Sequence, residues 1–98
     1  MRMKVITARI PDKEMRDLAL IEREEKIDRA EAVRKLLADS IKKWKIERAL
    51  SLLKERRATI RTAARFAELP YAEMMDLAAS SGIDIGYSLR DLQKDLQR

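Results

Sequence analysis

The sequence contains no cysteine and no histidine, and each absence excludes a class of chemistry. Without cysteine there are no disulfides and no thiol nucleophile. Without histidine there is no imidazole base for a hydrolytic triad and no ligand set for a zinc finger. Carboxylates such as Glu24 and Glu25 are typical of an ordinary solvated helix face. We therefore expect no enzyme activity, no metal and no cofactor.

Glycine, proline and aromatic residues are scarce, at 2 Gly, 2 Pro and 4% aromatic, whereas 40% of residues are charged and 46% are hydrophobic. The apolar residues are scattered singly or in runs no longer than Leu18 to Ile21, which excludes a membrane span and a secretory signal. A chain of 98 residues buries only a modest core by itself. We expect a helix-rich, soluble, cytoplasmic protein.

The net charge of +5 is distributed unevenly along the chain. Residues 1–41 carry 10 basic and 9 acidic residues, residues 42–65 carry 9 basic and 2 acidic, and residues 66–98 carry 3 basic and 6 acidic, so the three net charges are +1, +7 and −3. This pattern indicates polyanion binding by one part and protein contact by another, although a solvated helix face rich in Lys and Arg gives the same pattern.

Residues 4–10 alternate in polarity, with Ile6, Ala8 and Ile10 on one side. This period of two predicts a half-buried strand that ends at Pro11. Because no second strand is evident in the next seventy residues, we expect it to pair with the same strand of a second copy.

Two helices are predicted after Pro11. The first begins near Asp12 and continues to about Glu25, and Asp28 is a good N-cap for the second. Apolar residues recur along the second helix at helical spacing: Val33, Leu36, Leu37, Ile41 and Trp44. From Ile46 onward the apolar face rotates, which predicts a kink or a new helix near residues 44–46.

Shorter helices are predicted in the second half. Thr59 caps a helix around Thr62 to Ala67, and Pro70 opens another that ends toward Gly82. A further extended segment, Ile83 to Tyr87, and a final helix after Ser88 complete the pattern.

The segments VITARIPDKEM and IDRAEAVRKLL together resemble ribbon-helix-helix DNA-binding proteins over about 45 residues. The resemblance implies a mainly α fold with one N-terminal strand, in which two chains pair their strands as an intermolecular two-stranded antiparallel ribbon. In that family the ribbon enters the major groove of DNA. Residues 1–45 are then the DNA-binding and dimerisation domain, and residues 46–98 form a small helical region.

The outward face of such a ribbon supplies the predicted base contacts, Val5, Thr7 and Arg9. Arg9 is suited to guanine, Thr7 to a base edge or a methyl group, and Val5 to a thymine methyl. The predicted DNA phosphate contacts are Lys4, Asp28, Arg29 and Ala30, because the start of a helix offers unpaired backbone amides. Asp28 also has the simpler interpretation of a helix cap.

From Thr59 onward the sequence has paired alanines at Ala63 and Ala64, a short turn, a helix that ends in Gly82 and Ile83, and then Ile-x-Tyr and an acidic Asp-Leu tail. In these features it resembles a family of small uncharacterised prokaryotic proteins that are often encoded beside PIN-domain nucleases and regarded as antitoxins. Between Phe66 and Leu89 there is no Lys or Arg, so protein binding suits this region better than DNA binding. The predicted partner-binding residues are Tyr71, Met74, Met75, Tyr87, Arg90 and Lys94. Met74 and Met75 equally suit a small local core.

These observations together predict an antitoxin-type transcriptional repressor of a type II toxin–antitoxin module. It is expected to act as a homodimer that binds operator DNA through the ribbon. Its C-terminal region is expected to neutralise a toxin, and the expected toxin is a PIN-domain ribonuclease. The first alternative is a stand-alone ribbon-helix-helix regulator with no toxin partner, and the second is an interaction protein that binds no nucleic acid. No membrane partner is expected.

Overall fold

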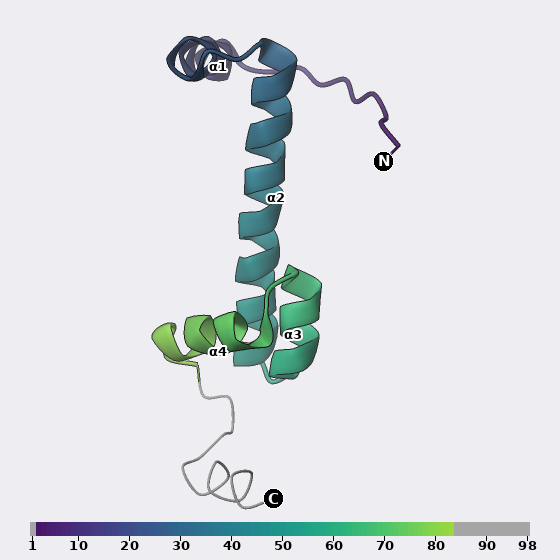
Figure 1. Cartoon of the computed structure of the whole chain (residues 1–98), viewed down its shortest axis with the longest axis vertical. Coiled ribbons are helices and arrows are strands. Elements are labelled where there is room, and N and C mark those ends of the chain that lie inside the picture. Colours follow the sequence, from purple (N-terminus) through teal and green to yellow (C-terminus); the bar gives the residue numbers. More distant parts are fainter. Residues whose placement is uncertain (1, 84–98) are drawn as a thin grey trace, which may run out of the picture. The chain divides into compact units, whose positions relative to one another are not determined.

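The computed structural model describes residues 2–83, in which the chain forms four helices in the order shown in Figure 1. Helix α1 spans Asp12–Glu25, α2 spans Arg29–Lys54, α3 spans Ile60–Ala67 and α4 spans Tyr71–Ser80. The chain divides into two compact units, an N-terminal unit of Met1–Asp39 and a C-terminal unit of Ser40–Arg98. The division falls inside α2.

The predicted N-terminal strand is wrong. Residues 2–83 contain no strand, and the segment before α1 is an irregular, exposed chain. Ile6 is 81% exposed and Ile10 is 48% exposed, although both were predicted to face the helices. Alternating polarity predicts which face of a strand would be buried, but a strand also requires a hydrogen-bonding neighbour, and no segment of the described chain supplies one. The predicted intermolecular ribbon, and with it the ribbon-helix-helix fold, therefore does not fit the structure.

The predicted helix ends in the first half are confirmed. Helix α1 follows Pro11, whose carbonyl accepts from the Met15 N–H at 3.1 Å, and it ends at Lys26, which is left-handed with φ of 54°. Helix α2 is capped by Asp28, whose Oδ1 accepts from the Glu31 N–H at 2.8 Å. These are local effects of residue type, which explains why the sequence predicts them.

Helix α2 is continuous through residues 44–46, so of the two alternatives that the sequence left open, a kink or a new helix, the new helix is excluded. The rotation of its apolar face is real: Ala49 and Leu53 are buried, whereas Leu37 and Trp44, on the earlier face, are 50% and 59% exposed. No proline or glycine interrupts the chain between Pro11 and Pro70, so nothing local ends the helix. One helix thus carries two apolar faces in succession.

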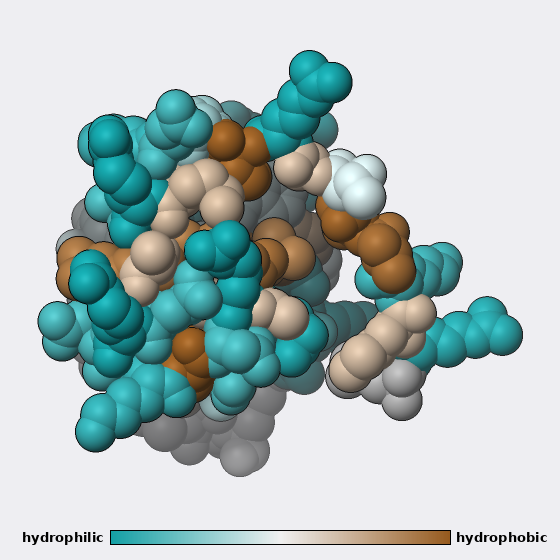
Figure 2. Space-filling view, turned by 90° about the horizontal axis from the view of Figure 1, so that it is seen from above, coloured by the Kyte–Doolittle hydropathy of each residue, from teal (hydrophilic) through white to brown (hydrophobic). Residues whose placement is uncertain are grey.

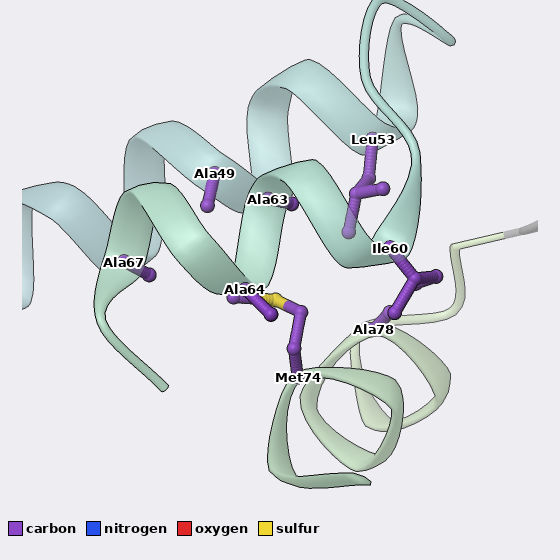
Figure 3. Packing of buried hydrophobic residues seen from close by; sticks show 8 residues of the cluster. All are labelled: Ala49, Leu53, Ile60, Ala63, Ala64, Ala67, Met74 and Ala78. Atoms are coloured by element: carbon purple, nitrogen blue, oxygen red, sulfur yellow. The ribbon is translucent and has the colours of Figure 1, made fainter. Parts of the chain in front are cut away.

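The C-terminal unit has a core in which small residues predominate (Figure 3). Met74, from α4, points toward Ala64 of α3, and both pack with α2 residues. The buried cluster consists of Ala49, Leu53, Ile60, Ala63, Ala64, Ala67, Met74 and Ala78. Alanine at five of these eight positions lets the three helices approach closely.

The predicted caps of the shorter helices are also confirmed. The Thr59 hydroxyl accepts from the Thr62 N–H at 3.1 Å, at the start of α3. Pro70 precedes α4, and Gly82 follows it with φ of 71°, while its N–H donates to the Ala79 carbonyl at 3.1 Å. Glycine adopts this left-handed conformation without steric cost. The segment predicted to be extended and the final predicted helix lie outside the described residues, apart from Ile83.

Candidate nucleic-acid and partner interface

The four site residues predicted before α1 are all exposed, on a segment without regular structure. Figure 2 shows hydrophobic side chains of this N-terminal segment uncovered, and Val5 is 92% exposed. The regular alternation that would align Val5, Thr7 and Arg9 in one row is therefore not formed, because there is no strand to impose it. Lys4 is exposed on the same segment.

Two of the three predicted phosphate contacts at the start of α2, Asp28 and Arg29, already have protein partners. Asp28 caps the helix, and Arg29 donates from Nε to Glu22 Oε2 at 3.1 Å. Ala30 is exposed. The structure therefore bears out the capping interpretation of Asp28.

A second ion pair lies nearby, between Lys35 Nζ and Glu25 Oε2 at 2.9 Å. The charge-assisted hydrogen bond to Glu25 raises the pKa of Lys35 above its ordinary value, with the Coulombic attraction of the same carboxylate as the next cause. Both side chains are about half exposed, so solvent screens the pair.

The cations of residues 42–65 lie on the surface of the C-terminal unit. Eight of the nine are exposed, and the ninth, Lys45, is partly buried and lies 3.6 Å from Glu68. The exposed set comprises Lys42, Lys43, Arg48, Lys54, Arg56, Arg57, Arg61 and Arg65. Six of these eight side chains lie on α2 and α3, and Arg56 and Arg57 lie in the turn between them, so a folded unit rather than a mobile tail presents the positive charge.

Two aromatic contacts accompany these cations, and the sequence did not predict either. Trp44 and Phe66 have ring centroids 6.4 Å apart, and they are 59% and 39% exposed. The Arg61 guanidinium lies 5.6 Å from the centre of the Tyr71 ring. Each pair joins different helices, so no local sequence signal identifies it.

The predicted partner-binding residues of α4 separate into two groups. Tyr71 is 45% exposed and Met75 is partly buried, whereas Met74 is fully buried. Met74 is therefore unavailable to a partner in this structure, and its alternative role in a local core is the correct one. Tyr87, Arg90 and Lys94 lie outside the described residues.

The surface of α4 and the turn before it differs sharply from that of α3. The described residues from Phe66 to Ile83 include no Lys or Arg, and Glu68, Glu73 and Asp76 are exposed. Positive and negative surfaces thus belong to successive helices, α3 and α4, which pack against each other. Such a separation permits two ligands of opposite charge on one small unit.

Neither a metal site nor a membrane-spanning helix is found within residues 2–83. No group of three or more Asp and Glu residues there is arranged to hold an ion. Helix α2 is long, but its frequent charges make it too polar to cross a bilayer, and the shorter helices do not qualify.

Residues 26–98 match the uncharacterised protein family UPF0175, so the chain belongs to that family. The match covers α2, α3 and α4 and begins directly after α1. Searches among curated proteins and among solved structures found no match.

Proposed function

We propose that this protein is a DNA-binding regulator of the antitoxin type. It binds operator DNA as a homodimer, and its C-terminal unit binds and neutralises a toxin, for which a PIN-domain ribonuclease is the expected partner. The observation that carries the proposal is the charge separation within the C-terminal unit, where cations cover α2 and α3 and none lies on the surface of α4.

The cationic surface supports the DNA-binding part of the proposal. Nucleic-acid affinity comes chiefly from neutralised phosphates, and this surface offers eight exposed cations. Since the predicted ribbon does not fit the structure, the proposal assigns phosphate attraction to the described cations rather than to the N-terminal segment. Base-specific contacts by Val5, Thr7 and Arg9 stay a prediction.

The surface of α4 supports the toxin-binding part. Tyr71 is exposed, and the exposed carboxylates of α4, Glu73 and Asp76, would repel DNA. The resemblance of this half to proteins encoded beside PIN-domain nucleases supplies the class of partner. A nuclease that binds RNA carries cations around its active site, which suits an acidic surface.

The N-terminal unit supports homodimer formation. Within its described residues Ala32 is the one buried hydrophobic residue, while Leu20, Val33, Leu36 and Leu37 are between 39% and 50% exposed. Two helices with so little buried area do not form a stable core alone. A second copy would cover these side chains with an identical apolar face.

Two paired measurements test the proposal. Binding to a duplex from directly upstream of the coding sequence, over about 50 to 200 mM salt, should be tight and salt-dependent, and tighter than binding to a scrambled duplex. The product of the adjacent reading frame should co-purify with the full chain. DNA binding without a co-purifying toxin would favour the stand-alone regulator, and absence of both would refute the proposal.

Matched variants assign the two activities to their surfaces. Replacing Lys42 and Arg65 with glutamine should reduce the salt slope of DNA binding by about 0.9 for each phosphate that the variant no longer neutralises. Replacing Glu73 and Asp76 with lysine should leave DNA binding intact and abolish toxin binding. If both pairs of substitutions changed the same activity equally, the assignment of separate surfaces would be wrong.

A further inference from the structure

A wide hollow on the N-terminal unit, with a volume of about 550 Å³, lies at the junction of α1 and the start of α2. Its lining consists of three arginines, one carboxylate and one small apolar side chain: Arg16, Arg23, Arg29, Glu22 and Ala19. None of these residues belongs to the cationic surface of the C-terminal unit. The hollow is therefore a separate feature that needs its own explanation.

Local geometry brings the three guanidinium groups together. Arg16, Ala19 and Arg23 are spaced by three and four residues, so they lie along one side of α1. The left-handed residue Lys26 ends α1, and the ion pair between Arg29 Nε and Glu22 Oε2, 3.1 Å apart, ties the start of α2 to this helix. Ala19 has no long side chain to fill the space between the arginines.

The charges in the hollow do not balance. Three arginines face one carboxylate, and Glu22 is already bonded to Arg29. Among the described residues no carboxylate forms an ion pair with Arg16 or Arg23. Arginines gathered in a shallow hollow repel one another, so an anion bound there would stabilise the group.

We propose that this hollow binds the phosphodiester backbone of nucleic acid, an inference that rests on the DNA-binding function proposed above and adds a second phosphate-binding site to it. Guanidinium groups match phosphate oxygens through paired hydrogen bonds, which a carboxylate of a protein partner also accepts. The favoured ligand is phosphate because the hollow is far larger than one carboxylate and open enough for a passing strand. The proposal does not depend on the amides of α2, because Asp28 already accepts the Glu31 N–H.

Glu22 gives the proposal a test in which the loss of a charged side chain should strengthen nucleic-acid binding. An anion in the hollow competes with Glu22 for Arg29, and the Glu22 charge itself repels a phosphate. Removing that charge should tighten binding, whereas removing Arg16 or Arg23 should weaken it. A role in helix stability alone would not produce opposite effects on nucleic-acid affinity.

The experiment measures binding of the full chain to the upstream duplex across the salt series, for Arg16→Gln, Arg23→Gln, the double variant and Glu22→Gln. Lys13→Gln is the matched control, since Lys13 is an exposed α1 cation outside the hollow. The double variant should reduce the salt slope by about 1.8, at about 0.9 per phosphate. Glu22→Gln should bind more tightly than the wild type, and Lys13→Gln should bind as the wild type does.

A second arm uses inorganic phosphate alone and follows the arginine Nε–Hε resonances of the full chain. Phosphate should shift the Arg16 and Arg23 resonances weakly, and a mononucleotide should do no better, whereas the duplex should shift them strongly.

If the double variant had the same salt slope of duplex binding as Lys13→Gln, the inference would be overturned while the proposed DNA-binding function stood. If the wild type bound no duplex, the proposed function would fail, and a response to phosphate alone would then assign the hollow to a small phosphate ligand. A stronger response to polyglutamate than to the duplex would assign it to an acidic peptide and overturn the choice of ligand.

Discussion

The two units differ in how much of their stability lies within a single chain. Among the described residues, the C-terminal unit has eight buried hydrophobic residues between three helices, whereas the N-terminal unit buries only Ala32. Both units are helical and rich in charge, so composition does not explain the difference. It arises because α3 and α4 pack against Ala49 and Leu53 of α2, while apolar side chains nearer the start of α2, such as Val33 and Leu37, stay exposed in the single chain. Secondary structure therefore forms in both units, but a core forms in one.

The largest effect is expected in the core of the C-terminal unit. Among the described residues Met74 is the one large side chain that is fully buried, so Met74→Ala should lower the free energy of unfolding by about 2–5 kcal/mol. Met75→Ala is the control, because Met75 is only partly buried and its loss should cost about 1 kcal/mol. Thermal and urea unfolding monitored by circular dichroism measure both. Equal losses would show that the cluster is not the main source of stability.

The second-largest effect is expected on the dimer dissociation constant, which tests whether a second copy covers the N-terminal unit. Leu37→Ser removes an apolar side chain that is 50% exposed in one chain. If it is buried in a dimer, about 1.5 kcal/mol is lost per copy, or about 100-fold in the dimer dissociation constant. Sedimentation equilibrium measures that constant, and Arg34→Ser, another exposed position of α2, should leave it unchanged. An unchanged constant for Leu37→Ser would leave this face without a role in assembly.

A smaller loss is expected at the start of α3. Thr59→Ala removes the hydroxyl that accepts the Thr62 N–H, which should lower the free energy of unfolding by about 1 kcal/mol. Ser51→Ala, in the interior of α2, is the control and should change stability by less than about 0.5 kcal/mol. Thermal unfolding distinguishes the two. A Thr59→Ala protein as stable as the control would mean that the cap contributes nothing.

The corresponding cap of α2 should act only locally. Asp28→Ala removes the acceptor of the Glu31 N–H, so amide hydrogen exchange should accelerate around Ala32. Exchange at Met74, in the other unit's core, should stay as slow as in the wild type. Faster exchange at both positions would show that the units unfold together and would contradict the contrast between them.

The smallest effect concerns pH. The pKa of Lys35 is raised in the folded chain, so its pair with Glu25 contributes stability that is complete below the unfolded value of about 10.5 and is lost as pH rises through the folded pKa. The difference in melting temperature between wild type and Lys35→Met should therefore be constant from about pH 7 to 9 and shrink above about pH 10.5. A difference that already shrinks near neutral pH would contradict this assignment.

Helix ends were the part of the fold that the sequence predicted well. Asp28, Thr59 and Gly82 each act on backbone groups within a few residues, so their effects are visible in the local sequence. The strand at residues 4–10 failed because alternation cannot reveal whether a hydrogen-bonding neighbour exists. The continuity of α2 could not be decided because a rotating apolar face is compatible with either outcome.

Some features of the candidate site could be predicted from the sequence, and others depend on which helices meet. The exposed cations of residues 42–65 follow from composition, and the core role of Met74 was one of two interpretations open from the sequence. The Trp44–Phe66 pair and the arginine hollow require knowledge of which helices meet, so no sequence pattern predicted them. The UPF0175 match includes the whole of α2, so it reaches further toward the N-terminus than the resemblance that was apparent from Thr59 onward.

Within residues 2–83, three residues other than glycine take left-handed conformations, and each follows the end of a helix: Lys26, Arg56 and Glu68. A side chain costs about 1–2 kcal/mol in this conformation, so these turns are under steric strain that glycine would relieve. Unlike glycine, all three residues are charged. Lys26 and Arg56 place cations beside the negative ends of α1 and α2, while the acidic Glu68 at the end of α3 is offset by Lys45. The ends of these helices are therefore sensitive to ionic strength in a way that glycine-capped ends are not, and salt should loosen them before it affects the alanine-rich core.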